Sequence, residues 1–378
     1  MNRRLAAQRS QQRPAACQPQ QTPERADMTS PAPPSPAAIR QARAEHPKLR
    51  DRDFAAELNI SEAQLVAAYA GHGATRIAPK PDDIVPRLTA LGEVMALTRN
   101  HSCVIEKTGV YENYRSGERA AMVNNPEIDL RFFPAHWVSA FAVVRECETG
   151  LRRSIQVFDA AGDAVHKIHL RPASDVGEFD RLVADLKLED QSAELMVEPR
   201  KPADGPRSNP EMAEELRRGW SELTDTHQFI GLTKKLKMNR LGAYRIAGAP
   251  FARELDTGAV NTMLEAVRDT KTEVMIFAGN MGCIEIHGGP IVNLKEMGPW
   301  QNVLDPGFDL HLRLDHIAEV WAVNKPTKRG DAVSAEAFDA EGTVIFQVFG
   351  RHNMGTDHRP AWNAIVDGLA SKPVLENA

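Results

Sequence analysis

A histidine at position 227 has a sequence context that suits a ligand of a metal. Before it, large apolar residues recur at intervals of three or four, at Met212, Leu216, Trp220 and Leu223. The same step leads on to His227 and Ile230, which predicts that His227 lies on a buried helical face. Asp225-Thr226, just before it, would cap a new helix. A neutral imidazole against an apolar wall is what an axial ligand of a metal or of haem iron needs, whereas the structural alternative is a core histidine with one hydrogen bond.

The sequence lacks the short motifs of several common enzyme classes. It has no G-x-x-x-x-G-K-[ST], no G-x-G-x-x-G after a strand, no G-x-S-x-G and no H-E-x-x-H. It also has no C-x-x-C-H, so covalent attachment of haem is excluded.

The chain contains an internal duplication with an offset of 180 residues. Glu93-Val94-Met95 matches Glu273-Val274-Met275, and Phe158-Asp159-Ala160 matches Phe338-Asp339-Ala340, with no gap from residue 93 to residue 170. Single identities in the same register include Asn100 with Asn280, Cys103 with Cys283, Asp129 with Asp309 and His136 with His316. We infer a tandem repeat of a unit of about 165 residues.

The patterns predict the same elements in both copies. A helical pair opens each copy, at Arg52–Ala70 and at Asp225–Ile246, and a helix closes it, at Asp175–Leu186 and at Pro360–Ala370. The strands predicted in the first copy are Glu93–Thr98, Cys103–Lys107, Val138–Glu146, Ser154–Phe158 and Ala164–Leu170. The last two flank a turn in which Gly162 suits a positive φ, as in a hairpin. Hairpins with helices at the ends indicate an α+β fold rather than a parallel sheet.

The duplication also predicts how the chain is divided and where a ligand binds. The predicted parts are a disordered N-terminal extension over 1–37, an N-terminal repeat over 38–195, a linker over 196–210 and a C-terminal repeat over 211–378. Two copies that face each other would form a cleft suited to a large flat ligand. Residues that both copies share, such as His136 and His316, are expected to hold the fold. Residues that break the symmetry are expected to serve a site.

Composition excludes some classes of partner. The 46 basic and 51 acidic residues give a formal net charge of −5, so no excess positive charge would drive binding to nucleic acid. The spacing of residues from Leu58 to Leu65 resembles a helix-turn-helix motif. The corresponding stretch of the second copy lacks the basic residues of a recognition helix, which argues against DNA binding. The 4 cysteines are too few for a disulfide framework, which is typical of a reducing compartment. No run of 18 apolar residues is present, so no membrane insertion is expected.

The first residues differ in composition from the rest of the chain. Residues 1–37 hold 7 of the 25 prolines and almost no large apolar side chains, which predicts disorder. The alternatives are a start of translation at Met28 and, because the first 27 residues carry five arginines, an organelle-targeting segment.

Six short stretches carry a resemblance to a known family. They are Ile128–Phe133, His136-Trp137, Asn302–Pro306, Leu310–Arg313, Lys325–Thr327 and Phe338–Ala340. Over roughly residues 40–372 the sequence resembles the hemin-degrading factors of the HemS, ChuS, HmuS and PhuS type. The resemblance implies a cytoplasmic haem-binding protein of bacterial haem uptake. It also implies two similar α+β halves with large antiparallel sheets that hold haem in the cleft between them.

The resemblance assigns roles to four residues. The family's axial histidine falls on His227, so that the iron of a non-covalent haem b would be ligated there. The arginine directed at a haem propionate falls on Arg240, and the lysine on the propionate side falls on Lys325. The distal arginine falls on Arg131. Haem carries two carboxylates, and charge-assisted hydrogen bonds to arginine or lysine would hold them.

One strand departs from the family pattern. Where the family has Tyr-Gln, this chain has Phe346-Gln347, which removes one hydrogen-bond donor while keeping both positions as expected haem contacts. The arginine expected shortly afterwards is Arg351, one residue early, and His352 beside it is the alternative.

Two functions fit this set of residues. The first is a carrier that takes haem from an inner-membrane importer and passes it to a separate haem oxygenase. The second is an enzyme that opens the porphyrin ring and releases the iron itself, with Arg131 as its catalytic residue. Both use the same binding site, so the sequence leaves the choice open; a cytosolic haem reservoir is a third variant.

Overall fold

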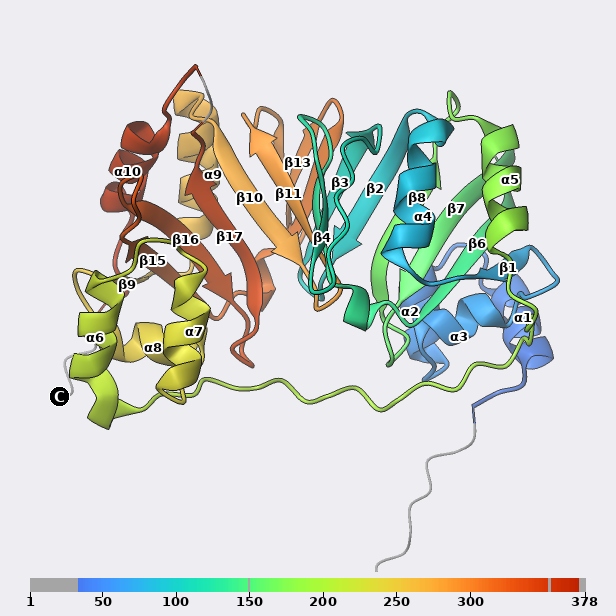
Figure 1. Cartoon of the computed structure of the whole chain (residues 1–378), viewed down its shortest axis with the longest axis horizontal. Helices are drawn as coiled ribbons and strands as arrows, with labels where there is room; N and C mark the ends of the chain where they lie inside the picture. The colour runs from blue at the N-terminus through green and yellow to red at the C-terminus, as the bar shows by residue number, and fades with distance from the viewer. Residues whose placement is uncertain (1–32, 149, 353–354, 374–378) are drawn as a thin grey trace, which may run out of the picture. The chain divides into compact units, whose positions relative to one another are not determined.

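The computed structural model describes residues 33–148, 150–352 and 355–373 (Figure 1). Most of the extension predicted to be disordered, including Met28, lies outside the described residues. The first described helix, α1 (Pro36–Glu45), begins near the predicted end of that extension. The Ser35 hydroxyl accepts a hydrogen bond from the Ala38 amide at 3.3 Å and so caps this helix.

Helices open and close each repeat, as the duplication predicts. Those of the first repeat are α2 (Asp51–Glu57), α3 (Glu62–Ala67), α4 (Pro81–Leu88) and α5 (Val176–Leu186). Those of the second are α6 (Ala213–Ser221), α7 (Gln228–Lys235), α8 (Arg240–Ala247), α9 (Ala259–Thr270) and α10 (Arg359–Gly368). Short 3₁₀ turns cover Thr89–Leu91, Pro134–His136, Pro210–Met212 and Leu314–His316. The predicted opening pairs are therefore α2 with α3 and α7 with α8.

The strands also follow the repeat. Those of the first repeat are β1 (Ala74–Ile77), β2 (Val94–Arg99), β3 (Cys103–Gly109), β4 (Ala121–Asn124), β5 (Asp129–Phe132), β6 (Ser139–Cys147), β7 (Gly150–Phe158) and β8 (Ala164–Leu170). Those of the second are β9 (Ala252–Leu255), β10 (Val274–Gly279), β11 (Cys283–Gly289), β12 (Leu294–Met297), β13 (Trp300–Asp305), β14 (Phe308–Arg313), β15 (Glu319–Lys325), β16 (Ala332–Phe338) and β17 (Val344–Gly350). Strands β2 and β10 are offset by 180 residues, as are β3 and β11.

The predicted hairpin turn is present in both repeats. Gly162 joins β7 to β8 with φ of 78°, and Gly342 joins β16 to β17 with φ of 82°. In the first repeat the Asp159 carboxylate accepts hydrogen bonds from the amides of Ala161 and Asp163, at 3.0 and 2.9 Å. A glycine is favoured at such a positive φ because it has no Cβ to clash with the backbone.

The strands form two large sheets, and neighbouring strands within each sheet run antiparallel among the described residues. The nine-stranded sheet has the order β1-β6-β7-β8-β2-β3-β14-β13-β12. The eight-stranded sheet has the order β4-β5-β11-β10-β17-β16-β15-β9. The α+β fold with large antiparallel sheets is thus confirmed.

The two repeats exchange strands. Strand β14 of the second repeat pairs with β3 of the first, and β5 of the first repeat pairs with β11 of the second. Strands β12 to β14 consequently extend the sheet of the first repeat, while β4 and β5 extend the sheet of the second. Arg131, although it belongs to the first repeat in sequence, therefore lies in the sheet of the second.

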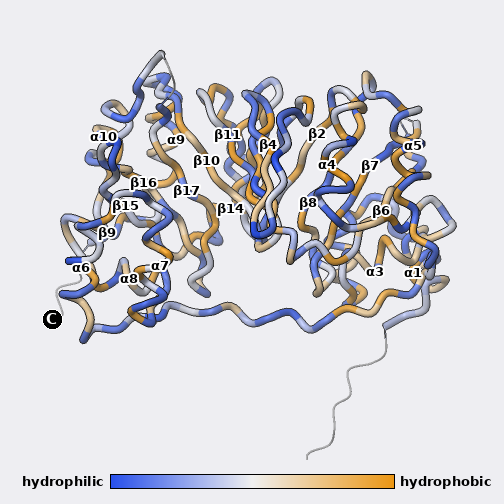
Figure 2. Tube along the Cα trace, viewed as in Figure 1, coloured by the Kyte–Doolittle hydropathy of each residue, from blue (hydrophilic) through white to orange (hydrophobic). Residues whose placement is uncertain are grey.

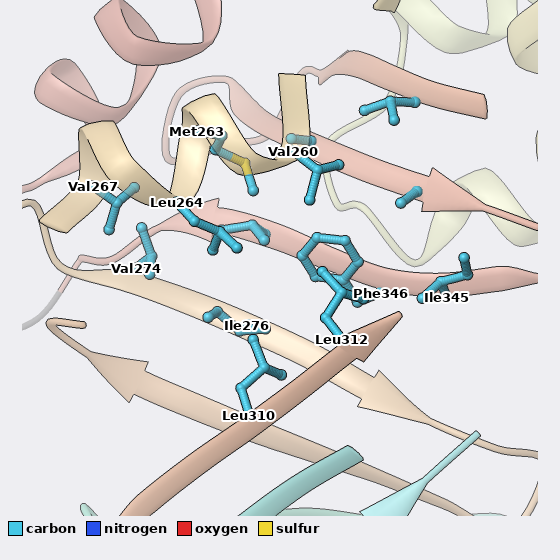
Figure 3. Close-up of a cluster of buried hydrophobic side chains, with 14 of the residues drawn as sticks. Val260, Met263, Leu264, Val267, Val274, Ile276, Leu310, Leu312, Ile345 and Phe346 are labelled. Atoms are coloured by element: carbon cyan, nitrogen blue, oxygen red, sulfur yellow. The ribbon is translucent and has the colours of Figure 1, made fainter. Parts of the chain in front are cut away.

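Apolar side chains pack between the sheets and the helices. In the second repeat, α9 and α10 cover one face of the eight-stranded sheet, and Val260, Leu264, Ile276 and Phe346 are among the buried side chains there (Figure 3). This core also includes Cys103 from the first repeat, while the core of the first repeat includes Cys283 from the second. The strand exchange thus joins the two cores.

Hydropathy follows this arrangement. Strands β2 and β10 alternate buried and half-buried residues along their whole length, and orange hydrophobic positions concentrate in the strands in Figure 2. The segment 187–209 between α5 and α6 is largely hydrophilic and holds no helix or named strand; it includes most of the stretch 196–210 that the sequence predicts as a linker. Within the described part of the chain, no helix is both long enough and apolar enough to cross a bilayer.

Candidate ligand-binding site

One face of the eight-stranded sheet collects most of the predicted site residues, and we call it the site face. Glu336 on β16 is the direct partner of Gln347 on β17 and of Trp321 on β15. Directly paired residues project on the same side of a sheet, as do residues separated by two positions along a strand. Lys325, four residues after Trp321, therefore projects on the same face as Gln347. Arg131 also lies on this face. Its partner Ile284 pairs with Gly279 of β10, and Gly279 lies two residues after Phe277, which is the partner of Gln347.

A buried group of charges occupies the site face beneath helix α8, and we call it the charge cluster. The Lys325 ammonium donates hydrogen bonds to Glu336 Oε1 at 3.0 Å and to the Tyr244 hydroxyl at 2.9 Å. Arg240, the first residue of α8, donates to Glu336 Oε2 at 2.9 Å, and the Tyr244 hydroxyl donates to the same oxygen at 3.0 Å. Ser334 donates to Glu336 Oε1 at 2.8 Å. Glu336 is thus the carboxylate with which Arg240 is paired in this structure.

Attraction within the charge cluster favours the ionised forms of Glu336 and Arg240. Burial by itself would raise the pKa of Glu336, but Lys325 and Arg240 together hold it well below its usual value. Burial would lower the pKa of Arg240, yet the attraction of Glu336 raises it overall. For Lys325 burial is the stronger effect and its pKa is lowered despite Glu336.

The charge cluster carries a surplus of one positive charge, since two cations share one carboxylate. The Lys325 side chain is 4% exposed and that of Arg240 is 29% exposed, so solvent and ligands reach the guanidinium first. A partly buried cation in excess is suited to bind a further anion, because charge-assisted hydrogen bonds are strong where water is scarce. This arrangement can bind a carboxylate.

His227 lies at the beginning of α7 and is exposed rather than buried. Its side chain is 90% exposed. The prediction of a buried position, for both His227 and Ile230, is therefore wrong. Helix α6 ends at Ser221 and α7 starts only at Gln228, so the helical step does not continue through the turn between them. Phe229 occupies the buried position instead.

The immediate partner of His227 nevertheless suits a metal ligand. The Asp225 carboxylate accepts hydrogen bonds from the His227 amide at 2.8 Å and from ring Nδ1 at 2.7 Å. These bonds lower the pKa of Asp225. A proton on Nδ1 leaves a lone pair on the exposed Nε2, and a carboxylate that orients a histidine in this way is common around metal ligands.

Helix α7 connects His227 with the charge cluster. The ring of Phe229, two residues after His227, has its centroid 5.1 Å from the Lys325 ammonium. The Tyr244 ring of α8 lies at 5.2 Å from the same nitrogen. The histidine, the arginine and the lysine predicted from the sequence thus belong to elements that pack against one another.

Arg131 lies on the site face but apart from the charge cluster. In the strand order β17-β10-β11-β5, Arg131 lies three strand spacings from the strand of Gln347, about 14 Å across the sheet. Its guanidinium forms an ion pair with Asp129 and donates to the Leu130 carbonyl at 3.0 Å. The Arg131 side chain is 30% exposed, so most of it is buried against the sheet and part of it is accessible to a ligand.

The residues predicted on β17 divide between the two faces. Gln347 projects on the site face. Phe346 projects on the other face and is 1% exposed in the core beside α9, which corrects its assignment as a ligand contact (Figure 3). The Arg351 guanidinium donates to the Glu273 carboxylate at 2.7 Å, and the Arg351 amide donates to the Glu273 carbonyl at 3.0 Å. Glu273 therefore holds Arg351 just after the C-terminal end of β17.

Glu336 and Tyr244 were not foreseen from the sequence, although both are central to the charge cluster. The repeat contains a signal for Glu336, because the residue 180 positions earlier is Gln156 and the charge breaks the symmetry. Tyr244 gives no comparable signal, since an aromatic residue on a helix is usually core.

Comparison with known protein families finds one domain twice in the chain. The model of the haemin-degrading HemS.ChuX domain matches residues 59–186 and again residues 237–369. The chain belongs to this family. The chain is also similar to two named transport proteins. Hemin transport protein HmuS of Yersinia pestis is 36% identical over 341 residues, 88% of this chain and 96% of that protein. Hemin transport protein HemS of Yersinia enterocolitica is 35% identical over the same length.

Solved structures of two further relatives share the fold. Holo-PhuS, a heme-binding protein from Pseudomonas aeruginosa, superposes with a TM-score of 0.85 at 42% identity, over 89% of this chain and 100% of that one. ChuS, described as an E. coli heme oxygenase, superposes with a TM-score of 0.78 at 31% identity, over 87% of this chain and 98% of that one.

Proposed function

We propose that this protein binds haem, accepts imported haem in the cytoplasm and passes it on for release of its iron. The observation that carries the proposal is the charge cluster, whose surplus positive charge suits a haem propionate. Relatives named for hemin transport and heme binding, at 35–42% identity over most of the chain, support it.

The residues of the site fit the chemistry of haem. Arg240 would bind a propionate because its guanidinium is the accessible cation of the charge cluster, and Lys325 behind it would add attraction. His227 would ligate the iron through Nε2, with Asp225 orienting the ring. When bound, haem would supply a redox-active iron centre. No covalent link is needed, so the ligand would be haem b.

The choice between carrier and enzyme rests on Arg131. A carrier needs reversible ligation and a surface for a donor, such as an inner-membrane importer, and for a recipient, such as a haem oxygenase. Ring opening is the second candidate, supported by the similarity to ChuS. For that reaction Arg131 would orient a ligand on the distal side, and Asp129 already holds its guanidinium. We place the carrier first because the binding residues alone suffice for it.

The test is a loading experiment with the full chain. Purified protein receives one equivalent of hemin, then ascorbate and catalase in air, while the Soret band is followed. Catalase is needed because free peroxide bleaches haem without any enzyme. A stable band supports the carrier. A decaying band with chelatable iron supports ring opening, and no Soret shift on adding hemin overturns both.

His227→Ala separates ligation from non-specific haem adsorption. We expect the variant to lose affinity and to change the Soret maximum. His72→Ala is the matched control, because His72 is an exposed histidine of the other repeat, and it should leave the spectrum unchanged. Identical spectra for the His227 variant and the wild type would remove His227 as the axial ligand.

A further inference from the structure

Three potential metal ligands meet on the nine-stranded sheet, away from the site face. Glu106 on β3 is the direct partner of Asp309 on β14, and His311 follows two residues later on the same side of the strand. All three are half-buried, and their ligating atoms lie within 4.8 Å of one another. Two carboxylates and one imidazole are a common ligand set for divalent transition metals.

The histidine of this trio is oriented by a partner outside it. His311 Nδ1 donates to the Asn302 side-chain carbonyl at 2.6 Å. The amide of Asn302 is itself fixed, because its nitrogen donates to the Lys295 carbonyl at 2.9 Å. The proton is thereby kept on Nδ1, and Nε2 retains its lone pair. Metal-binding histidines are characteristically held by such a second hydrogen bond.

Within the part of the chain that the structure describes, neither carboxylate forms an ion pair with a lysine or an arginine. The two residues are direct partners across β3 and β14, and both are half-buried. Two half-buried carboxylates side by side without a counterion are unfavourable unless a proton or a cation joins them.

The repeat provides an internal comparison. At the offset of 180 residues, Asp309 corresponds to Asp129, and His311 corresponds to Arg131. On the eight-stranded sheet, the Arg131 guanidinium pairs with Asp129. On the nine-stranded sheet, the arginine is replaced by a histidine, and Glu106 stands where the other copy has Ile286. The substitutions remove the built-in cation and add a second anion at the equivalent place.

We propose that Glu106, Asp309 and His311 bind one divalent transition-metal cation. Metal–ligand bonds of about 2.1 Å put two ligands at most about 4.2 Å apart, so small side-chain rotations close the trio around the ion. The cation takes the place that the guanidinium of Arg131 has in the other repeat, and its two charges balance the two carboxylates. Water would complete the coordination. The site is independent of the proposed haem function, since none of its ligands lies on the site face.

The test uses Co²⁺ as a spectroscopic probe on metal-free, haem-free full-length protein. We expect one equivalent of Co²⁺ to bind, with visible absorption bands from nitrogen and oxygen ligands, and Zn²⁺ to displace it. His311→Ala and Asp309→Asn should each weaken Co²⁺ binding at least tenfold. Asp315→Asn is the matched control, because Asp315 is an aspartate of the same segment that pairs with Arg313, and it should bind Co²⁺ like the wild type.

Thermal unfolding of each variant without metal separates loss of a ligand from loss of the fold. Retained stability with lost Co²⁺ binding supports the proposal. No Co²⁺ binding by the wild type, or equal binding by the His311 variant, overturns it. Haem titration of the same variants should match the wild type, so failure of the metal site and failure of the haem proposal would be distinguished.

Discussion

Glu336 is the single anion of the charge cluster, and it is fully buried between two cations. Its carboxylate accepts four hydrogen bonds, from Lys325, Arg240, Tyr244 and Ser334. Removing one partner of a buried ion pair leaves the other charge uncompensated, which is usually more destabilising than the pair was stabilising. The residue therefore holds the two proposed propionate-binding cations in place.

Glu336→Gln is expected to destabilise the fold by about 3–5 kcal/mol at pH 7. The folded-state pKa of Glu336 lies well below its usual value, so its contribution is complete above the usual glutamate pKa of about 4.3 and declines as the pH falls below it. Urea unfolding from pH 7 down to pH 3 should show a steeper acid loss in the wild type than in the variant.

Two further variants control this prediction. Glu178→Gln removes a surface partner of Arg181 and should change stability by about 0–1 kcal/mol. Adding Lys325→Met to Glu336→Gln removes the uncompensated ammonium and should recover part of the loss. If the double variant were as unstable as the sum of both single variants, Lys325 and Glu336 would not be coupled.

Arg240→Ala should weaken haem binding without changing the ligation of the iron. One charge-assisted hydrogen bond contributes about 1.5–3 kcal/mol, which corresponds to an increase in Kd of about 10–150-fold. Arg245→Ala, in the same helix but paired with Glu319, is the control and should bind haem like the wild type. A changed spin state of the iron in the Arg240 variant would contradict its assignment to a propionate.

At the scale of elements, the sequence predicted what depends on local periodicity. The register of the repeat located both opening helical pairs, and the Asp159–Asp163 turn was recognised from its glycine. His227 was misplaced because the six residues between Ser221 and Gln228 interrupt the helix. There the Asp225 side chain binds the His227 amide, a local hydrogen bond that competes with helix continuation. Periodicity alone carries no sign of such a break.

The exchange of strands could not be predicted from the duplication. Strands β5 and β14 are equivalent in the two copies, so the duplication does not say which sheet each of them joins. The choice is made by tertiary packing, since Leu130 and Phe132 join the core of the first repeat while their backbone pairs with β11 of the second. The same packing determines which of the two sheets carries Arg131.

The exchange predicts that the repeats do not fold separately. A fragment over residues 211–378 lacks β4 and β5, so the edge of β11 and its apolar neighbours would be exposed. We expect this fragment, and likewise residues 34–200, to show no cooperative urea transition alone. Co-expression should restore a complex with cooperative unfolding. A cooperative transition of either isolated fragment would contradict the dependence on exchanged strands.

At the scale of the whole duplicated chain, the two sheets present equivalent faces of different charge. On the eight-stranded sheet, Lys325 and Arg240 outnumber Glu336 by one charge. On the nine-stranded sheet, Lys167 corresponds to Gln347 and is paired with Glu62 of helix α3, which leaves no surplus cation in that pair. Arg145, the counterpart of Lys325, shares Asp51 with Arg43, and the two negative charges of Glu106 and Asp309 on the same face outweigh that single surplus cation. An anionic ligand is therefore favoured on only one of the two sheets.

This asymmetry predicts one haem per chain despite the duplication. A difference titration with hemin should reach its end point at one equivalent, because the nine-stranded sheet offers the propionates two carboxylates and a balanced ion pair. Glu106→Gln with Asp309→Asn removes that repulsion and leaves Arg145 and Arg43 sharing the one carboxylate of Asp51, so a second equivalent bound by this variant alone would show that the two carboxylates exclude haem from the nine-stranded sheet. A wild-type end point at two equivalents would mean that the symmetry of the fold, rather than the charge of each face, determines where haem binds.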